Sequence, residues 1–94
     1  MNQVYWSTVA TADLDYICNY MRSYSNVYAK TFVRKIFQAI EMLIKFPLSG
    51  RLVPEYELDR IREILIFTNY RLIYQVTDNT IGIIAIHHQN RNIS

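Results

Sequence analysis

The sequence predicts an α+β protein in which an N-terminal strand and an antiparallel helix hairpin pack on a small antiparallel sheet, in the order β-α-α-β-β-β. Two observations support this prediction. Apolar residues recur at three- and four-residue spacing through two segments of the N-terminal half, which is typical of amphipathic helices. Alternating runs separated by short turn sequences fill the C-terminal half, which is typical of a strand meander. With 94 residues, the chain is expected to form a single domain over residues 1–94.

The first strand and the first helix are predicted within the first 24 residues. Residues 2–6 are expected to form a short strand, and Ser7 is the candidate N-cap of a helix from about Thr8 to Tyr24. The apolar stripe of this helix is expected to consist of Val9, Ala10, Leu14, Ile17, Cys18 and Met21.

The second helix is predicted to begin after Ser25 or Asn26, either of which is a suitable cap, and to end at about Phe46. Pro47 follows and cannot continue a helix. The link between the helices is short, so the two are expected to form an antiparallel hairpin. The stripe of the second helix is expected to consist of Ala29, Phe32, Val33, Ile36, Ala39, Ile40, Leu43 and Phe46.

A loop is expected over residues 47–59, which contain two prolines, a glycine and an acidic end. Three strands are expected to follow, at about 60–67, 70–76 and 80–88. The residues between them are of the kind that make tight hairpins, namely Thr68-Asn69 and Asp78-Asn79.

Composition narrows the classes of function. Hydrophobic residues make up 51% and charged residues 19% of the chain, which argues against disorder. No apolar run reaches the length of a membrane span, and the N-terminus shows no signal peptide, so no membrane association is expected. A single cysteine, Cys18, cannot form an internal disulfide, and we expect a cytoplasmic protein. The net charge of +2 does not by itself indicate a nucleic-acid binder.

The strand over residues 70–76 contains the most informative charge in the sequence. Alternation places Arg71 on one face with Ile73 and Gln75, while the opposite face is entirely apolar. We expect the face of Arg71 to be wet or lightly covered. Its guanidinium would then be presented from a rigid element to a phosphate or a carboxylate.

Several basic groups follow one another on the predicted strands and their exit, namely Arg62, Arg71, His87 or His88, and Arg91. Neighbouring strands lie roughly 5 Å apart, so these groups are expected to meet on one sheet surface. An imidazole beside guanidiniums suits phosphodiester cleavage, because the imidazole moves a proton while the guanidiniums stabilise charge in the transition state. The alternative is that His88 closes a strand and forms local hydrogen bonds.

No metal or cofactor is predicted. His87 and His88 are adjacent on a strand and point to opposite faces, so they cannot converge on one ion. The sequence contains no P-loop, dinucleotide fingerprint or zinc spacing. Three tyrosines beside the helix-hairpin turn are expected either to form an exposed patch for a protein partner or to cap the helix pair, namely Tyr20, Tyr24 and Tyr28.

Four segments together resemble the RelE/ParE family, the small toxins of bacterial type II toxin–antitoxin pairs that are also called plasmid stabilisation proteins. They are residues 46–55, the pair Arg62-Glu63, the strand 70–76 and residues 87–92. The resemblance covers nearly the whole chain. It implies the RelE/ParE fold and a cognate antitoxin as partner.

The resemblance also implies roles for individual residues. Arg71 occupies the position of the arginine that contacts the scissile phosphate in RelE-like toxins, and Arg91 that of a second phosphate-facing arginine. Arg62 occupies the position of the first of two catalytic lysines, whereas the second position is Ile64. His88 is then the candidate general base or acid. Secondary candidates are Glu63, His87 and Arg51.

Two activities are implied. We expect a toxin that acts as a ribosome-dependent, metal-independent mRNA endoribonuclease and so inhibits translation, with mRNA on the ribosome as its partner. The alternative is a ParE-like inhibitor of DNA gyrase that is not an enzyme, and residues 50–55 resemble that side of the family. A third possibility is a degenerate member that binds its antitoxin but is no longer toxic.

Overall fold

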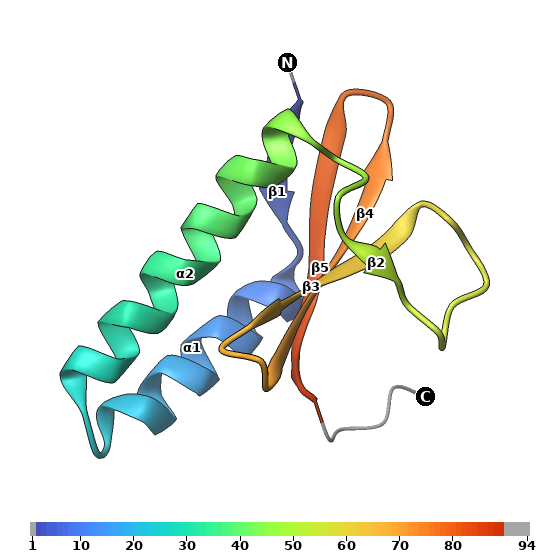
Figure 1. Ribbon diagram of the computed structural model, residues 1–94. Helices are drawn as coiled ribbons and strands as arrows, with labels where there is room; N and C mark the ends of the chain where they lie inside the picture. The colour runs from blue at the N-terminus through green and yellow to red at the C-terminus, as the bar shows by residue number, and fades with distance from the viewer. Residues whose placement is uncertain (1, 90–94) are drawn as a thin grey trace.

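The computed structural model describes residues 2–89 and shows a helix hairpin lying against one face of a twisted sheet (Figure 1). The elements are β1 (Gln3–Trp6), α1 (Thr8–Arg22), α2 (Asn26–Lys45), β2 (Arg51–Leu52), β3 (Ile61–Ile66), β4 (Tyr70–Thr77) and β5 (Thr80–His88). The predicted α+β class and the order of strands and helices are confirmed, with one further short strand, β2, inside the segment expected to be a loop.

The sheet has the order β1-β5-β4-β3-β2. β3, β4 and β5 form the predicted antiparallel meander. β1 pairs parallel to β5, so the sheet as a whole is mixed; the sequence pattern specified neither a pairing partner nor a direction for this strand. Two helices separate β1 from the meander, and therefore no tight turn fixes the direction in which β1 must run.

Local hydrogen bonds fix where both helices begin. The Ser7 hydroxyl accepts from the amide of Ala10 at 2.9 Å, and the Ser25 hydroxyl accepts from the amide of Tyr28 at 3.1 Å. Ser7 is thus the predicted cap of α1, and Ser25 rather than Asn26 caps α2. Both helices end one or two residues earlier than predicted, at Arg22 and Lys45.

The main core lies between the helix hairpin and the sheet. Its helical members are Ala10, Ile17, Cys18, Met21, Ala29, Phe32, Ile36, Ile40 and Leu43, all within the predicted stripes. Val9 and Phe46 were expected in the stripes but are 57% and 63% exposed. Val9 lies in the first turn of α1 beside Ala10, which is the buried residue of that turn, and Phe46 lies just past the end of α2.

A second, smaller core lies on the other face of the sheet. Val53, in the connection after β2, is fully buried against Ile61 and Ile73, and Tyr56 packs on this cluster. The connection from β2 to β3 therefore covers part of the face that the helices leave open.

A β-bulge interrupts the pairing of β4 with β5. Ile73 pairs with Ala85, but the next residue, Tyr74, pairs with Ile83, so Ile84 is the extra residue. An extra residue reverses the alternation of side chains beyond it, because the period of a strand is two. The last part of β5 therefore presents its side chains to the faces opposite to those predicted from alternation alone.

No helix within residues 2–89 is both long enough and apolar enough to cross a membrane.

Candidate functional site

Arg71 is buried. Its side chain is 7% exposed, and its three guanidinium nitrogens all donate to carboxylates. Nε donates to Oε1 of Glu63 at 2.6 Å, while Nη1 and Nη2 donate to the two oxygens of Glu55 at 2.8 Å each. The expectation of a wet or lightly covered face is wrong at this position, because the connection after β2 brings Glu55 over the strand.

Glu63 links Arg71 to a second arginine. The Glu63 side chain is completely buried, and its Oε2 accepts from Nε of Arg51 at 2.5 Å. Arg51 is 57% exposed, so it forms the outer member of the group. We call Arg51, Glu55, Glu63 and Arg71 the ion-pair quartet. Two positive and two negative side chains give it a formal charge of zero.

Contacts within the quartet shift the pKa values of Glu55 and Arg71 in the directions that favour their ionised forms. The hydrogen bonds from Arg71 lower the pKa of Glu55 from 4.5 to about 2, and the nearby positive charge of His87 adds to the effect. In return, the bond to Glu55 raises the pKa of Arg71 above its usual value. Both groups therefore remain ionised at every physiological pH.

The quartet opens to solvent through a shallow hollow of about 250 Å³, lined by Arg51, Pro54, Glu55, Glu63, Arg71 and Gln89. His87 lies beside it, because the strand register pairs His87 directly with Arg71. Of the two histidines, the one adjacent to Arg71 is therefore His87 and not His88.

Arg62 lies on the opposite face of the sheet from Arg71, since it pairs with Tyr74 in the register of β3 and β4. Its Nε donates to the carbonyl of Asp59 at 2.9 Å, and its Nη1 donates to the carbonyls of Leu48 and Gly50 at 3.2 and 3.1 Å. Arg62 thus ties together the two ends of the connection around β2.

His88 is on the helix side of the sheet, where its ring meets Tyr70 edge to face at a centroid distance of 5.4 Å. Arg62 and His88 therefore both lie on the helix side of the sheet, whereas Arg71 lies on the other face. The prediction that the three residues share one sheet surface is wrong. Without the bulge at Ile84, alternation would have placed His88 beside Arg71. Arg91 lies outside the described residues.

Sequence reasoning missed one member of the quartet. Glu63 and Arg71 were both candidates, and the short turn between their strands already makes them diagonal neighbours on one face. Glu55 belongs to the acidic end of residues 47–59, the segment that was expected to be a loop. No periodicity links it to Arg71, since it comes from a connection whose path depends on the burial of Val53.

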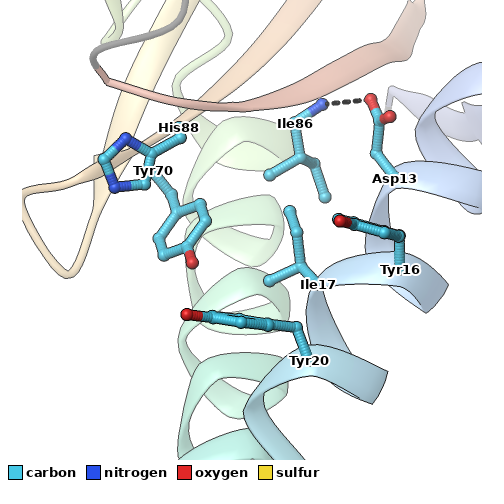
Figure 2. A pocket seen from close by; sticks show the side chains of 7 residues that line it. All are labelled: Asp13, Tyr16, Ile17, Tyr20, Tyr70, Ile86 and His88. Carbon is cyan, nitrogen blue, oxygen red and sulfur yellow. Dashed lines mark hydrogen bonds between the residues drawn. The ribbon is translucent and has the colours of Figure 1, made fainter.

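A second hollow, of about 590 Å³, lies between α1 and the sheet (Figure 2). We call it the tyrosine pocket, and its lining residues are Asp13, Tyr16, Ile17, Tyr20, Tyr70, Ile86 and His88. It adjoins the predicted aromatic patch, in which Tyr20 and Tyr24 are 58% and 60% exposed and meet edge to face. Tyr28 instead stacks on Phe67 and is partly buried against the core.

Among residues 2–89, no group of three histidine, cysteine, aspartate or glutamate side chains is placed to hold a metal ion.

Comparison with known proteins gives the class to which this fold belongs. Residues 4–93 match the family described as the ParE toxin of the type II toxin-antitoxin system parDE. Toxin RelE2 of Caulobacter vibrioides is 31% identical over 91 residues, which cover 97% of this chain and 99% of the relative. The solved chromosomal ParDE system from P. aeruginosa shares the fold, with a TM-score of 0.73 at 22% identity, covering 94% of this chain and 96% of that one.

These matches define a small toxin of the RelE/ParE class, from the type II toxin–antitoxin systems. Within that class, the chain belongs to the ParE toxin family. Membership of a toxin–antitoxin family implies an antitoxin as its partner.

Proposed function

We propose that this toxin arrests bacterial growth by binding DNA gyrase as a protein inhibitor and that it does not cleave RNA. The observation on which the proposal depends is that the Arg71 side chain is only 7% exposed and its guanidinium is already paired with two carboxylates. Each of its three guanidinium nitrogens already donates to Glu55 or Glu63.

The charge of the quartet supports the same proposal. A phosphodiester is an anion, and its cleavage develops further negative charge on the phosphate oxygens. Enzymes stabilise this charge with an excess of cations or donors aimed at the reacting group. Here two carboxylates balance two guanidiniums, and one of those carboxylates, Glu63, is completely buried. Bringing a phosphate into this hollow would place it beside Glu55 and Glu63.

The arrangement of the proton carriers and cations supports it as well. The candidate general base, His88, lies across the sheet from Arg71, and Arg62 is engaged with backbone carbonyls. In this reading the quartet is structural and holds the connection after β2 on the sheet. Membership of the ParE family and the resemblance of residues 50–55 to ParE-like toxins support DNA gyrase as the proposed target.

Two assays on the same purified chain test the proposal. Supercoiling of relaxed plasmid by gyrase should be inhibited, and toeprinting in a translation extract should show no new message ends. Expression without an antitoxin should arrest growth, and His87→Ala should arrest it equally well because no proton carrier is needed. Message cleavage without gyrase inhibition would overturn the proposal, and so would normal growth at high soluble expression.

One observation favours the second candidate, a ribosome-dependent mRNA endoribonuclease. His87 is paired in register with Arg71, so an imidazole and a guanidinium do lie on one face. Glu55 belongs to a connection rather than a strand and is 31% exposed, which makes it the partner that a phosphate would displace. In that case His87→Ala should lower cleavage by about 100-fold or more, because it removes the proton carrier.

A further inference from the structure

The tyrosine pocket lies at the point where α1 crosses the end of the sheet. Tyr16 and Tyr20 are one helical turn apart, so both rings project from the same side of α1. Figure 2 shows Tyr70 and His88 reaching the pocket from the sheet, with Ile17 and Ile86 between the two groups. Tyr16 is 75% exposed and Tyr20 58%, so these rings add little to the core and remain accessible to a ligand.

Asp13 is held at one end of the pocket by the exposed edge of β5. β1 pairs with β5 only as far as Ile83. Beyond that point, Ser7 and the first turns of α1 form the hydrogen bonds to the edge of β5. The Ser7 amide and hydroxyl donate to the carbonyls of Ile83 and Ile84 at 2.9 and 2.8 Å. Next along the edge, the amide of Ile86 donates to Oδ2 of Asp13 at 2.9 Å, as Figure 2 shows. The position of Asp13 is therefore fixed by the backbone.

The charge at the pocket selects the class of ligand. Among the described residues that line the pocket, Asp13 is the acidic side chain and His88 the basic one, and neither lysine nor arginine is present. A carboxylate has about four lone-pair sites, so the bond from Ile86 leaves acceptor capacity for a ligand. A phosphate or carboxylate would be repelled, and a purely apolar group would desolvate Asp13 without pairing it.

The aromatic rings of the pocket also favour a cationic ligand, as the Asp13 carboxylate does. The faces of tyrosine rings attract cations, and guanidinium in particular stacks on them. Apolar side chains at the floor of the pocket, Ile17 and Ile86, suit the alkyl stem of a long basic residue. The pocket is an open hollow of about 590 Å³, which leaves room for the backbone of a partner across its rim.

We propose that the tyrosine pocket binds an arginine side chain of a protein partner, with the guanidinium paired to Asp13 and flanked by Tyr16 and Tyr20. Buried arginines are frequent anchors of protein interfaces, and a pocket of aromatic rings with one carboxylate is a site that can recognise them. This inference does not depend on whether the toxin acts on gyrase or on the ribosome.

An NMR titration of the ¹⁵N-labelled chain tests the proposal with two nearly isosteric probes, N-acetyl-arginine amide and its neutral counterpart N-acetyl-citrulline amide. The arginine probe should shift the amide resonances of Ile17 and Ile86 in a saturable way. The citrulline probe should bind about five- to tenfold more weakly, because it lacks the charge that pairs with Asp13.

A matched pair of variants locates the effect. Asp13→Asn should weaken the arginine probe by about five- to tenfold, while its amide oxygen can still accept from Ile86. Asp15→Asn is the control, since Asp15 is an exposed acid on the same helix outside the lining, and it should leave binding within about twofold.

Several outcomes would overturn the proposal: equal binding of the two probes, an Asp13→Asn variant that binds arginine as well as wild type, or tighter binding of adenosine monophosphate than of the arginine probe. The last result would assign the pocket to nucleobases. If Asp13→Asn does not fold, the comparison of the two probes on the wild-type chain still decides the matter.

Discussion

Replacing Arg71 by alanine should destabilise the fold strongly, although alternation alone would place this residue on a solvent-facing strand surface. The variant leaves Glu63 completely buried with Arg51 as its remaining partner in the quartet, and that arginine is 57% exposed. Removing one member of a buried ion pair costs about 3–5 kcal/mol, because the other charge stays buried without compensation. We expect the free energy of unfolding to fall by roughly that amount.

Arg51→Ala is the matched control, because Arg51 pairs with the same carboxylate from a position that is more than half exposed. An exposed ion pair contributes about 0–1 kcal/mol, so this variant should remain close to wild type. Urea unfolding of the two purified variants measures the difference. For a domain of this size, a loss of about 3 kcal/mol also lowers the thermal midpoint by more than about 10 °C.

A double variant tests the cause. Adding Glu63→Gln to Arg71→Ala removes the buried negative charge, so it should recover about 1–2 kcal/mol of the loss. Equal losses for Arg71→Ala and Arg51→Ala would refute the reasoning, as would a double variant less stable than Arg71→Ala alone. Either result would mean that the quartet does not hold the connection after β2 in place.

Two further predictions concern the same region. The pKa of Glu55 is lowered from 4.5 to about 2, so its contribution to stability is complete above about pH 4.5 and is lost as the pH falls toward 2. Glu55→Gln should therefore lose less stability between about pH 6 and about pH 3 than wild type or Glu57→Gln does, and equal losses in urea midpoints would contradict the assignment. Gly50→Ala should cost about 1–3 kcal/mol, since its Cβ would lie 2.5 Å from the Tyr74 hydroxyl and 2.7 Å from the Glu63 carbonyl. Gly82→Ala is its control, because the nearest atom there is 3.5 Å away, and similar thermal midpoints for the two alanine variants would show that Gly50 is not tightly packed.

Local sequence features, namely helix caps, turn residues and apolar periodicity, were sufficient to predict the helices and the meander. Ser7 and Ser25 cap the helices through bonds to residues three positions away. Asn79 accepts the positive φ of 54° that the turn between β4 and β5 requires, as expected for asparagine. The amphipathic stripes then specify which helix faces are buried, because the period of each element fixes its side-chain directions.

The candidate site depended on features that no local pattern contains. A single bulge residue, Ile84, reverses the faces of His87 and His88, and therefore decides which imidazole lies beside Arg71. Bulges arise from the fit between strands and not from the alternation of one strand, so alternation alone placed His88 and not His87 on the face of Arg71.

The environment of Arg71 was decided in the same way by tertiary structure. Its position on a strand, opposite an apolar face, followed from the sequence alone. Whether that guanidinium would meet solvent, a phosphate or a carboxylate depended on the path of the connection after β2, which the burial of Val53 fixes against Ile61 and Ile73. Periodicity determines the direction of a side chain, whereas the packing of distant segments determines what it meets, and here it meets Glu55 and Glu63.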